Sequence, residues 1–166
     1  MAWERLQEVE GIDVQRMGII GLSMGGFVAA LLTGQDGVHP KSVALLSAVN
    51  NLPEIIAMME ETGDISPHQD VYDYHGLAVG REFMQTAKEY NAQEAIAAYP
   101  GHLLLITGSA DEMIPPLCSE QYAQAHEDQP GRTEHLSIPE GNHVFADLRH
   151  NTMAIEQIVS WFKETL

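Results

Sequence analysis

The sequence is poor in cysteine and in basic residues, and each shortage excludes a class of protein. Cys118 is the one cysteine among 166 residues, so the chain can form no internal disulfide and no cysteine-based metal cluster. Because no activating neighbour is evident in the sequence, we expect this thiol to be a packing residue. The 8 lysine and arginine residues stand against 24 aspartate and glutamate residues, which gives a formal net charge of -16. Such a chain repels phosphate backbones and anionic lipids, so we expect no nucleic-acid partner and no membrane surface as partner.

Long apolar runs are also missing. No run approaches the ~20 residues that span a bilayer. The first ten residues, MAWERLQEVE, hold no basic segment followed by an apolar stretch. These features predict a cytoplasmic protein. At this length we expect one domain, residues 1–166, with roughly 70 % of the unfolded surface buried.

Short apolar segments alternate with segments of helical periodicity. This alternation predicts an α/β fold of three layers, α/β/α, in which helices cover both faces of a sheet of about four parallel strands. We expect the strands at residues 16–22, 42–48, 102–108 and 133–139 and the helices at residues 2–9, 24–33, 116–127 and 152–165. Residues 51–97 are far too long for an ordinary connection. Two stretches in them, PEIIAMMEE and GREFMQTAKEY, have helical spacing, which predicts a small helical cap insertion.

The stretch GLSMG, residues 21–25, fits the pattern G-x-S-x-G and stands between a predicted strand and a predicted helix. A sharp turn there would strain the serine backbone, and side chains at Gly21 and Gly25 would collide with the adjoining backbone. Ser23 would then project its hydroxyl at the positive end of the helix dipole, where the Met24 amide can donate to a developing oxyanion. Ser23 is therefore a candidate nucleophile. The alternative is a glycine-rich turn whose serine only caps the helix.

A serine nucleophile needs a base, and the base needs a carboxylate that orients it. The third predicted strand runs into GSADEMIPP, which contains Asp111, and the fourth runs into IPEGNHVFAD, which contains His143. Because the carboxyl ends of parallel strands meet at one edge of a sheet, we expect both side chains near Ser23. The order Ser, Asp, His is that of the G-x-S-x-G arrangement. The sequence thus predicts a triad of Ser23, His143 and Asp111.

Other polar residues are weaker candidates. Asp147 could replace Asp111 as the acid, but it stands near the start of the last predicted helix rather than at a strand end. The stretch HQDVYDYH contains His68, Asp70, Asp73 and His75, whose spacing matches no established set of metal ligands. We therefore expect no metal and no cofactor.

Three motifs together resemble those of the α/β-hydrolases. GLSMGG resembles the nucleophile elbow, GSADEMIPP the acid loop after the seventh strand, and GNHVF the histidine loop after the eighth. YHGLAVGREFM is similar to a segment of bacterial cinnamoyl and feruloyl esterases. The resemblance implies a serine hydrolase that cleaves small-molecule carboxylic esters through an acyl-enzyme intermediate.

Three alternatives remain open. A peptidase of the prolyl-oligopeptidase type has a similar elbow and acid loop, although nothing in this sequence resembles its propeller domain. A dienelactone hydrolase more often carries cysteine at the elbow. The third alternative is a catalytically weak or inactive α/β-hydrolase fragment that folds as an oligomer.

The resemblance also implies parts that this sequence lacks. Members of the family generally have eight strands, with the nucleophile after the fifth, whereas here the nucleophile is residue 23. The first four strands have no counterpart, nor does the loop whose amide supplies the second oxyanion donor. Loss of one such donor costs on the order of 10²- to 10³-fold in turnover. The strand at 16–22 would be an exposed apolar edge, so we expect a homodimer or a higher homo-oligomer.

Overall fold

The computed structural model describes residues 2–66, 68–74 and 76–166. Contacts divide the chain into two compact units. The first unit comprises the residues up to Asn50 together with Ala92–Leu166, and the second comprises Asn51–Asn91. The inserted segment is therefore shorter than the predicted 51–97. Among the residues described, no helix combines the length and the apolar character needed to cross a membrane.

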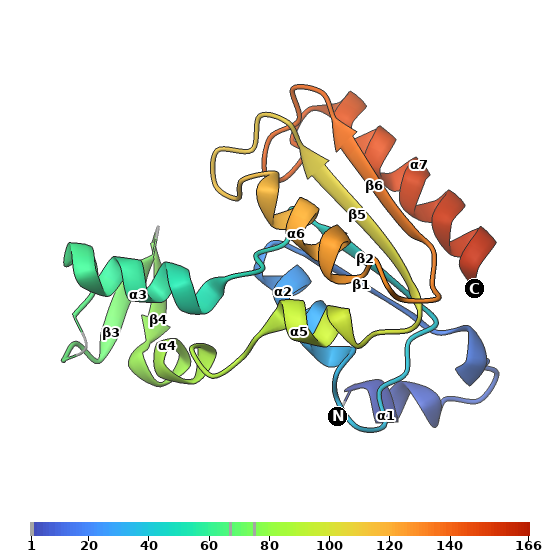
Figure 1. The fold of residues 1–166 in the computed structure, drawn as a ribbon, viewed down its shortest axis with the longest axis horizontal. Helices are drawn as coiled ribbons and strands as arrows, with labels where there is room; N and C mark the ends of the chain where they lie inside the picture. The colour runs from blue at the N-terminus through green and yellow to red at the C-terminus, as the bar shows by residue number, and fades with distance from the viewer. Residues whose placement is uncertain (1, 67, 75) are drawn as a thin grey trace. The chain divides into compact units, whose positions relative to one another are not determined.

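Four parallel strands form the sheet of the first unit (Figure 1). They are β1 (Gly18–Leu22), β2 (Ser42–Leu46), β5 (His102–Gly108) and β6 (Thr133–Ile138), in the spatial order β1-β2-β5-β6. All five residues of β2 are buried, and β5 is buried beyond its first residue. This is the burial expected for central parallel strands that are covered on both faces. The predicted strands and their parallel arrangement are confirmed.

Helices lie on both faces of this sheet. On one face α2 (Met24–Leu32) packs on β1 and β2, and α6 (Leu117–Ala125) packs on β5 and β6. Between them lies α5 (Ala92–Ala97), which contacts both helices and therefore belongs to this unit rather than to the insertion. On the other face lies α7 (Leu148–Thr165). The three predicted layers are confirmed.

The C-terminal helix α7 is anchored at both ends. Trp161 and Ala154 pack into a core cluster with side chains of β2, β5 and β6, and the Trp161 indole N–H donates to Ser42 Oγ at 2.6 Å. At the other end, the Asp147 side chain accepts the Arg149 N–H at 2.8 Å and caps the helix. This cap explains why α7 begins four residues before the predicted position.

Strand β1 is the edge of the sheet. Within the described part of the chain, no strand pairs with its outer side. A Cβ at Gly18 would lie 2.7 Å from Phe162 Cε1, which places Gly18 on the face that α7 covers. Since side chains alternate along a strand, Ile20 and Leu22 share that face, and they are 53 % and 41 % exposed. An apolar strip of β1 therefore stays uncovered in this unit.

Two short helices precede this edge strand. They are α1 (Ala2–Gln7) and the 3₁₀ helix η1 (Val14–Arg16). Trp3 of α1 is buried and packs in a small cluster with Met17 and Val38. The predicted helix at 2–9 is thus present but ends two residues early.

The second unit contains helices and a hairpin. The helices α3 (Leu52–Thr62) and α4 (Arg81–Ala87) match the two predicted helical stretches. The strands β3 (Val71–Tyr74) and β4 (Leu77–Gly80) form an antiparallel pair that the sequence pattern does not predict. Four-residue strands give too short an alternation to recognise, and burial of Tyr72 in the core of this unit stabilises them.

Candidate active site

Ser23 occupies the sharp turn between β1 and α2. Its backbone has φ 56° and ψ -122°, a region that L-residues rarely adopt. The Ser23 N–H donates to Leu46 O at 2.8 Å, and Ser23 O accepts the Gly26 and Phe27 amides at 3.0 and 3.2 Å. These bonds hold the strained turn. The Ser23 hydroxyl makes no capping hydrogen bond in the described chain, which contradicts the alternative that it only caps the helix.

Two glycines make room for this turn, and one of them differs from the prediction. A Cβ at Gly21 would lie 2.2 Å from Gly25 O, so the predicted collision at Gly21 is confirmed. At Gly25 a Cβ would meet nothing within 4 Å, so that prediction is wrong. The close approach occurs at Gly26, whose Cβ would lie 2.4 Å from Ala48 Cβ. The local pattern does not show which face of α2 meets the neighbouring loop.

The three predicted triad residues lie together at the carboxyl ends of three strands. His143 Nε2 lies 2.9 Å from Ser23 Oγ, and His143 Nδ1 lies 2.9 Å from Asp111 Oδ2. The histidine and the aspartate are almost completely buried. Because the carboxylate accepts a hydrogen bond from the Nδ1–H, Nε2 is free to accept the hydroxyl proton of the serine.

Asp111 is held as an anion by several donors. Its Oδ1 accepts the Met113 and Ile114 amides, both at 2.9 Å, while Oδ2 faces His143. Burial by itself raises the pKa of this carboxyl. The hydrogen bonds from Ile114, His143 and Met113 outweigh burial and hold the pKa of Asp111 below its ordinary value. A carboxylate in this position can hold the imidazole in one orientation.

The Met24 amide lies at the N-terminus of α2, directly after Ser23. The first amides of a helix have no acceptor within it and carry the positive end of the helix dipole. This N–H can therefore donate to negative charge that develops next to the Ser23 hydroxyl. The absence of a second donor stays a prediction.

The competing residues do not join this cluster. Asp147 is occupied as the helix cap described above, and Cys118 is buried in the first turn of α6. No group of three or more His, Cys, Asp or Glu side chains that could hold a metal occurs among the described residues. Of the four residues considered as metal ligands, His75 lies outside the described residues.

The loop after β2 also borders the candidate site, although its sequence does not indicate this. Ser47 there has a φ of 40° and is buried, and its N–H donates to Ile106 O at 2.8 Å. The Val49 N–H lies 3.4 Å from Ser23 O. Residues 47–50 carry no turn signal, since the left-handed position is a serine rather than a glycine.

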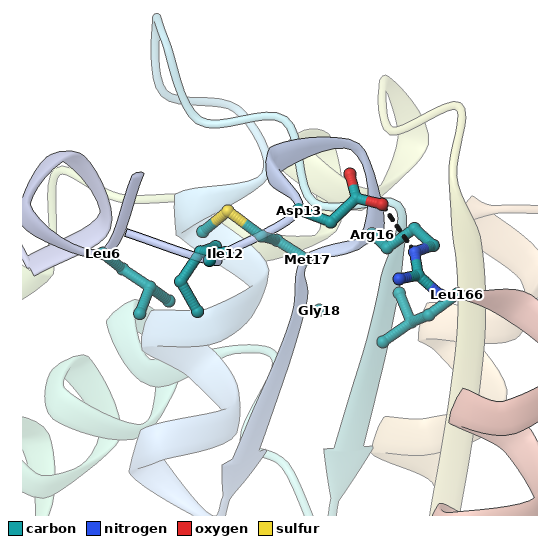
Figure 2. Close-up of a pocket in the computed structure, with 8 residues that line it drawn as sticks. Leu6, Ile12, Asp13, Arg16, Met17, Gly18 and Leu166 are labelled. Carbon is teal, nitrogen blue, oxygen red and sulfur yellow. Dashed lines mark hydrogen bonds and ion pairs between the residues drawn. The ribbon is translucent and has the colours of Figure 1, made fainter. Parts of the chain in front are cut away.

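A pocket of about 460 Å³ lies elsewhere, at the amino end of β1 (Figure 2). Leu6, Ile12, Met17 and Leu166 line it, together with the ion pair of Asp13 and Arg16. Because Gly18 lies at the amino end of β1 and Ser23 follows its carboxyl end, this pocket is separate from the cluster of Ser23, His143 and Asp111.

Known proteins resemble this chain in sequence and in fold. Acylamino-acid-releasing enzyme 2 of Oryza sativa subsp. japonica is 25 % identical over 173 residues, which cover 95 % of this chain and 21 % of the rice protein. The chain thus spans about a fifth of that relative.

Among solved structures, ferulic-acid-bound Est1E from Butyrivibrio proteoclasticus superposes with a TM-score of 0.81 at 18 % identity, over 99 % of this chain and 64 % of Est1E. The esterase domain of a Rhodothermus marinus protein gives a TM-score of 0.68 at 19 % identity, over 87 % of this chain and 59 % of that one. These likenesses show the α/β-hydrolase fold.

The model of the prolyl oligopeptidase family matches residues 1–166, the whole chain. The chain therefore belongs to the prolyl oligopeptidase family of serine hydrolases with the α/β-hydrolase fold.

Proposed function

We propose that this protein cleaves carboxylic esters through an acyl-enzyme intermediate on Ser23. The observation that carries the proposal is the unbroken chain of hydrogen bonds from Ser23 Oγ through His143 to Asp111, with both distances at 2.9 Å. A nucleophile, a base and an orienting carboxylate in this geometry are the requirements of acyl transfer at a serine.

Each step uses a group that the fold already positions. Ser23 Oγ attacks the ester carbonyl carbon while its proton passes to His143 Nε2. The oxyanion of the tetrahedral intermediate accepts a hydrogen bond from the Met24 N–H. The intermediate collapses when the alcohol leaves with the proton from His143. A water molecule, deprotonated by His143, then attacks the acyl-enzyme, which releases the carboxylic acid and restores the Ser23 hydroxyl. Asp111 stays ionised and stabilises the imidazolium in both halves of the reaction.

The choice of esters as first substrates has two supports. The solved relatives include an esterase domain and a protein that binds ferulic acid, an aromatic carboxylic acid. In addition, one identified oxyanion donor favours substrates with a good leaving group, since these demand less stabilisation of the tetrahedral intermediate. Activated aryl esters and esters of hydroxycinnamic acids are therefore the substrates to test first.

Peptide bonds are the second candidate substrate. The family match and the rice relative named as an acylamino-acid-releasing enzyme both favour it. The amine of a peptide is a poorer leaving group than an aryl alcohol, so this activity needs more oxyanion stabilisation. Hydrolysis of an acylated aminoacyl p-nitroanilide at a kcat/KM above that of the matched p-nitrophenyl ester would favour the peptidase.

Replacement of the nucleophile tests the proposal. We expect Ser23→Ala to reduce p-nitrophenyl butyrate hydrolysis to background and to abolish labelling by a fluorophosphonate probe. Ser160→Ala, an exposed serine on α7, is the matched control and should keep both. Hydrolysis that survives in Ser23→Ala would refute the assignment. If the unaltered protein fails to react with the probe, the chain is an inactive scaffold.

A further inference from the structure

A strained turn at the start of the histidine loop is hydrogen-bonded to the acid loop. The Gly141 N–H donates to Ile138 O at 3.1 Å and closes a turn over residues 138–141. Pro139 is its second residue, and Glu140, its third, has a φ of 58°. These are features of a type II turn, whose third position favours glycine or asparagine. A glutamate there is held in a left-handed conformation that its Cβ disfavours.

Contacts from the acid loop hold this turn in place. Ser109 Oγ accepts the Glu140 N–H at 2.9 Å. On either side of that bond, the Ser109 N–H donates to Ile138 O at 3.0 Å and the Ala110 N–H donates to Gly141 O at 2.9 Å. The bond to the Ser109 hydroxyl is the one side-chain contact in this group of three. It satisfies the amide of the strained residue itself.

The position of this turn determines where His143 lies. His143 follows Gly141 by two residues, and the next turn is closed by the Phe145 N–H, which donates to Asn142 O at 3.1 Å. Phe145 is buried in the same core cluster as Trp161, and this packing holds it in place. The imidazole thus stands between a buried anchor at Phe145 and the turn that Ser109 holds.

We propose that Ser109 is a positioning residue for His143. Its hydroxyl accepts the Glu140 N–H, keeps the left-handed turn closed, and so keeps His143 within hydrogen-bond distance of both Asp111 and Ser23. The inference rests on the proposed function only for the role of His143 as base. Ser109 and Glu140 are both exposed, so water can satisfy the amide when the hydroxyl is removed. Loss of the hydroxyl should therefore loosen the turn without unfolding the chain.

Replacing the acceptor gives the first test. For Ser109→Ala we expect kcat on p-nitrophenyl butyrate to fall on the order of tenfold, with KM within about twofold, because misplacement of a catalytic group lowers turnover rather than binding. Ser109→Thr keeps the hydroxyl and should recover most of the rate. Ser160→Ala controls for the loss of an exposed serine hydroxyl elsewhere. An unchanged kcat in Ser109→Ala, or no recovery in Ser109→Thr, would overturn the proposal.

A second test removes the strain instead of the acceptor. Glycine adopts a positive φ freely, so Glu140→Gly in the Ser109→Ala background should restore kcat. Glu140→Gln in the same background removes the charge but keeps the Cβ, and it should restore nothing. Equal recovery by both variants would mean that the carboxylate charge, rather than the turn, causes the defect, and would contradict the proposal.

A third measurement is independent of activity. The proton shared by His143 Nδ1 and Asp111 should give a low-field signal in the proton NMR spectrum, and in Ser109→Ala this signal should broaden as solvent exchange accelerates. Ser23→Ala should leave the signal present. A sharp, unshifted signal in Ser109→Ala would overturn the positioning role. A different result would contradict the proposed function, namely ester hydrolysis that survives in Ser23→Ala.

Discussion

Gly108, the last residue of β5, allows the histidine loop to approach the acid loop. A Cβ at this position would lie 2.2 Å from Gly141 O, 2.5 Å from Gly141 C and 2.9 Å from Asn142 O. All three are backbone atoms, so no side chain can rotate away. Non-bonded carbon and oxygen atoms stay about 3.3 Å apart, so Gly108→Ala forces the loops apart by about 1 Å.

This displacement reaches the triad because His143 is two residues beyond Gly141. A shift of about 1 Å lengthens a 2.9 Å hydrogen bond beyond the range in which it holds. We expect kcat to fall about 10²-fold, which is the usual effect of such a misplacement. The strain should lower the free energy of unfolding by about 1–3 kcal/mol. The free energy of unfolding of a domain is typically about 5–15 kcal/mol, which exceeds this loss, so the variant should remain folded.

Two assays check this prediction. Hydrolysis of p-nitrophenyl butyrate measures kcat, and urea unfolding measures the free energy of unfolding. Gly80→Ala is the matched control, since a Cβ there would meet nothing within 4 Å. A Gly108→Ala variant with the kcat of the unaltered protein would refute the reasoning, because the loops would then have separated without moving His143.

Three further predictions concern the elbow, the acid and the edge strand. Gly26→Ala, with its Cβ 2.4 Å from a neighbouring side chain, should lower the free energy of unfolding by about 1–3 kcal/mol, while Gly25→Ala should change it by less than about 1 kcal/mol in urea unfolding. Folding lowers the pKa of Asp111 from its ordinary value of 3.8. The contribution of this carboxylate to the free energy of unfolding is therefore complete above pH 3.8 and is lost as the pH falls through the lower pKa of the folded state. Asp111→Asn should remove this acid dependence from thermal unfolding curves. We also propose that the protein self-associates through the edge of β1, so Ile20→Lys should reduce the molar mass measured by light scattering, whereas the control Val71→Lys should not. A monomeric mass for the unaltered protein would contradict this proposal.

Local patterns were sufficient for the strands and for the elbow. Continuous Val, Ile and Leu segments mark buried parallel strands, and a serine between glycines at a strand-to-helix junction marks the strained turn. The same local information was insufficient at Gly25, because only the packing of α2 against Ala48 shows that Gly26 is the residue without room for a side chain. It also failed for the hairpin of the second unit, whose strands are too short to show a period.

The sequence by itself determined the order of the four parallel strands along the chain and the identity of Ser23, Asp111 and His143 as candidates. Each of these residues follows an apolar strand and carries the chemistry that acyl transfer needs. Tertiary structure decided the distances. His143 lies 2.9 Å from Asp111, 32 positions away in sequence, and 2.9 Å from Ser23, 120 positions away. The register of β1, β2, β5 and β6 brings these residues together, and no local pattern contains that register. The link from Ser109 to Glu140 has the same origin, since a bond between two loops exists only once both strands are paired.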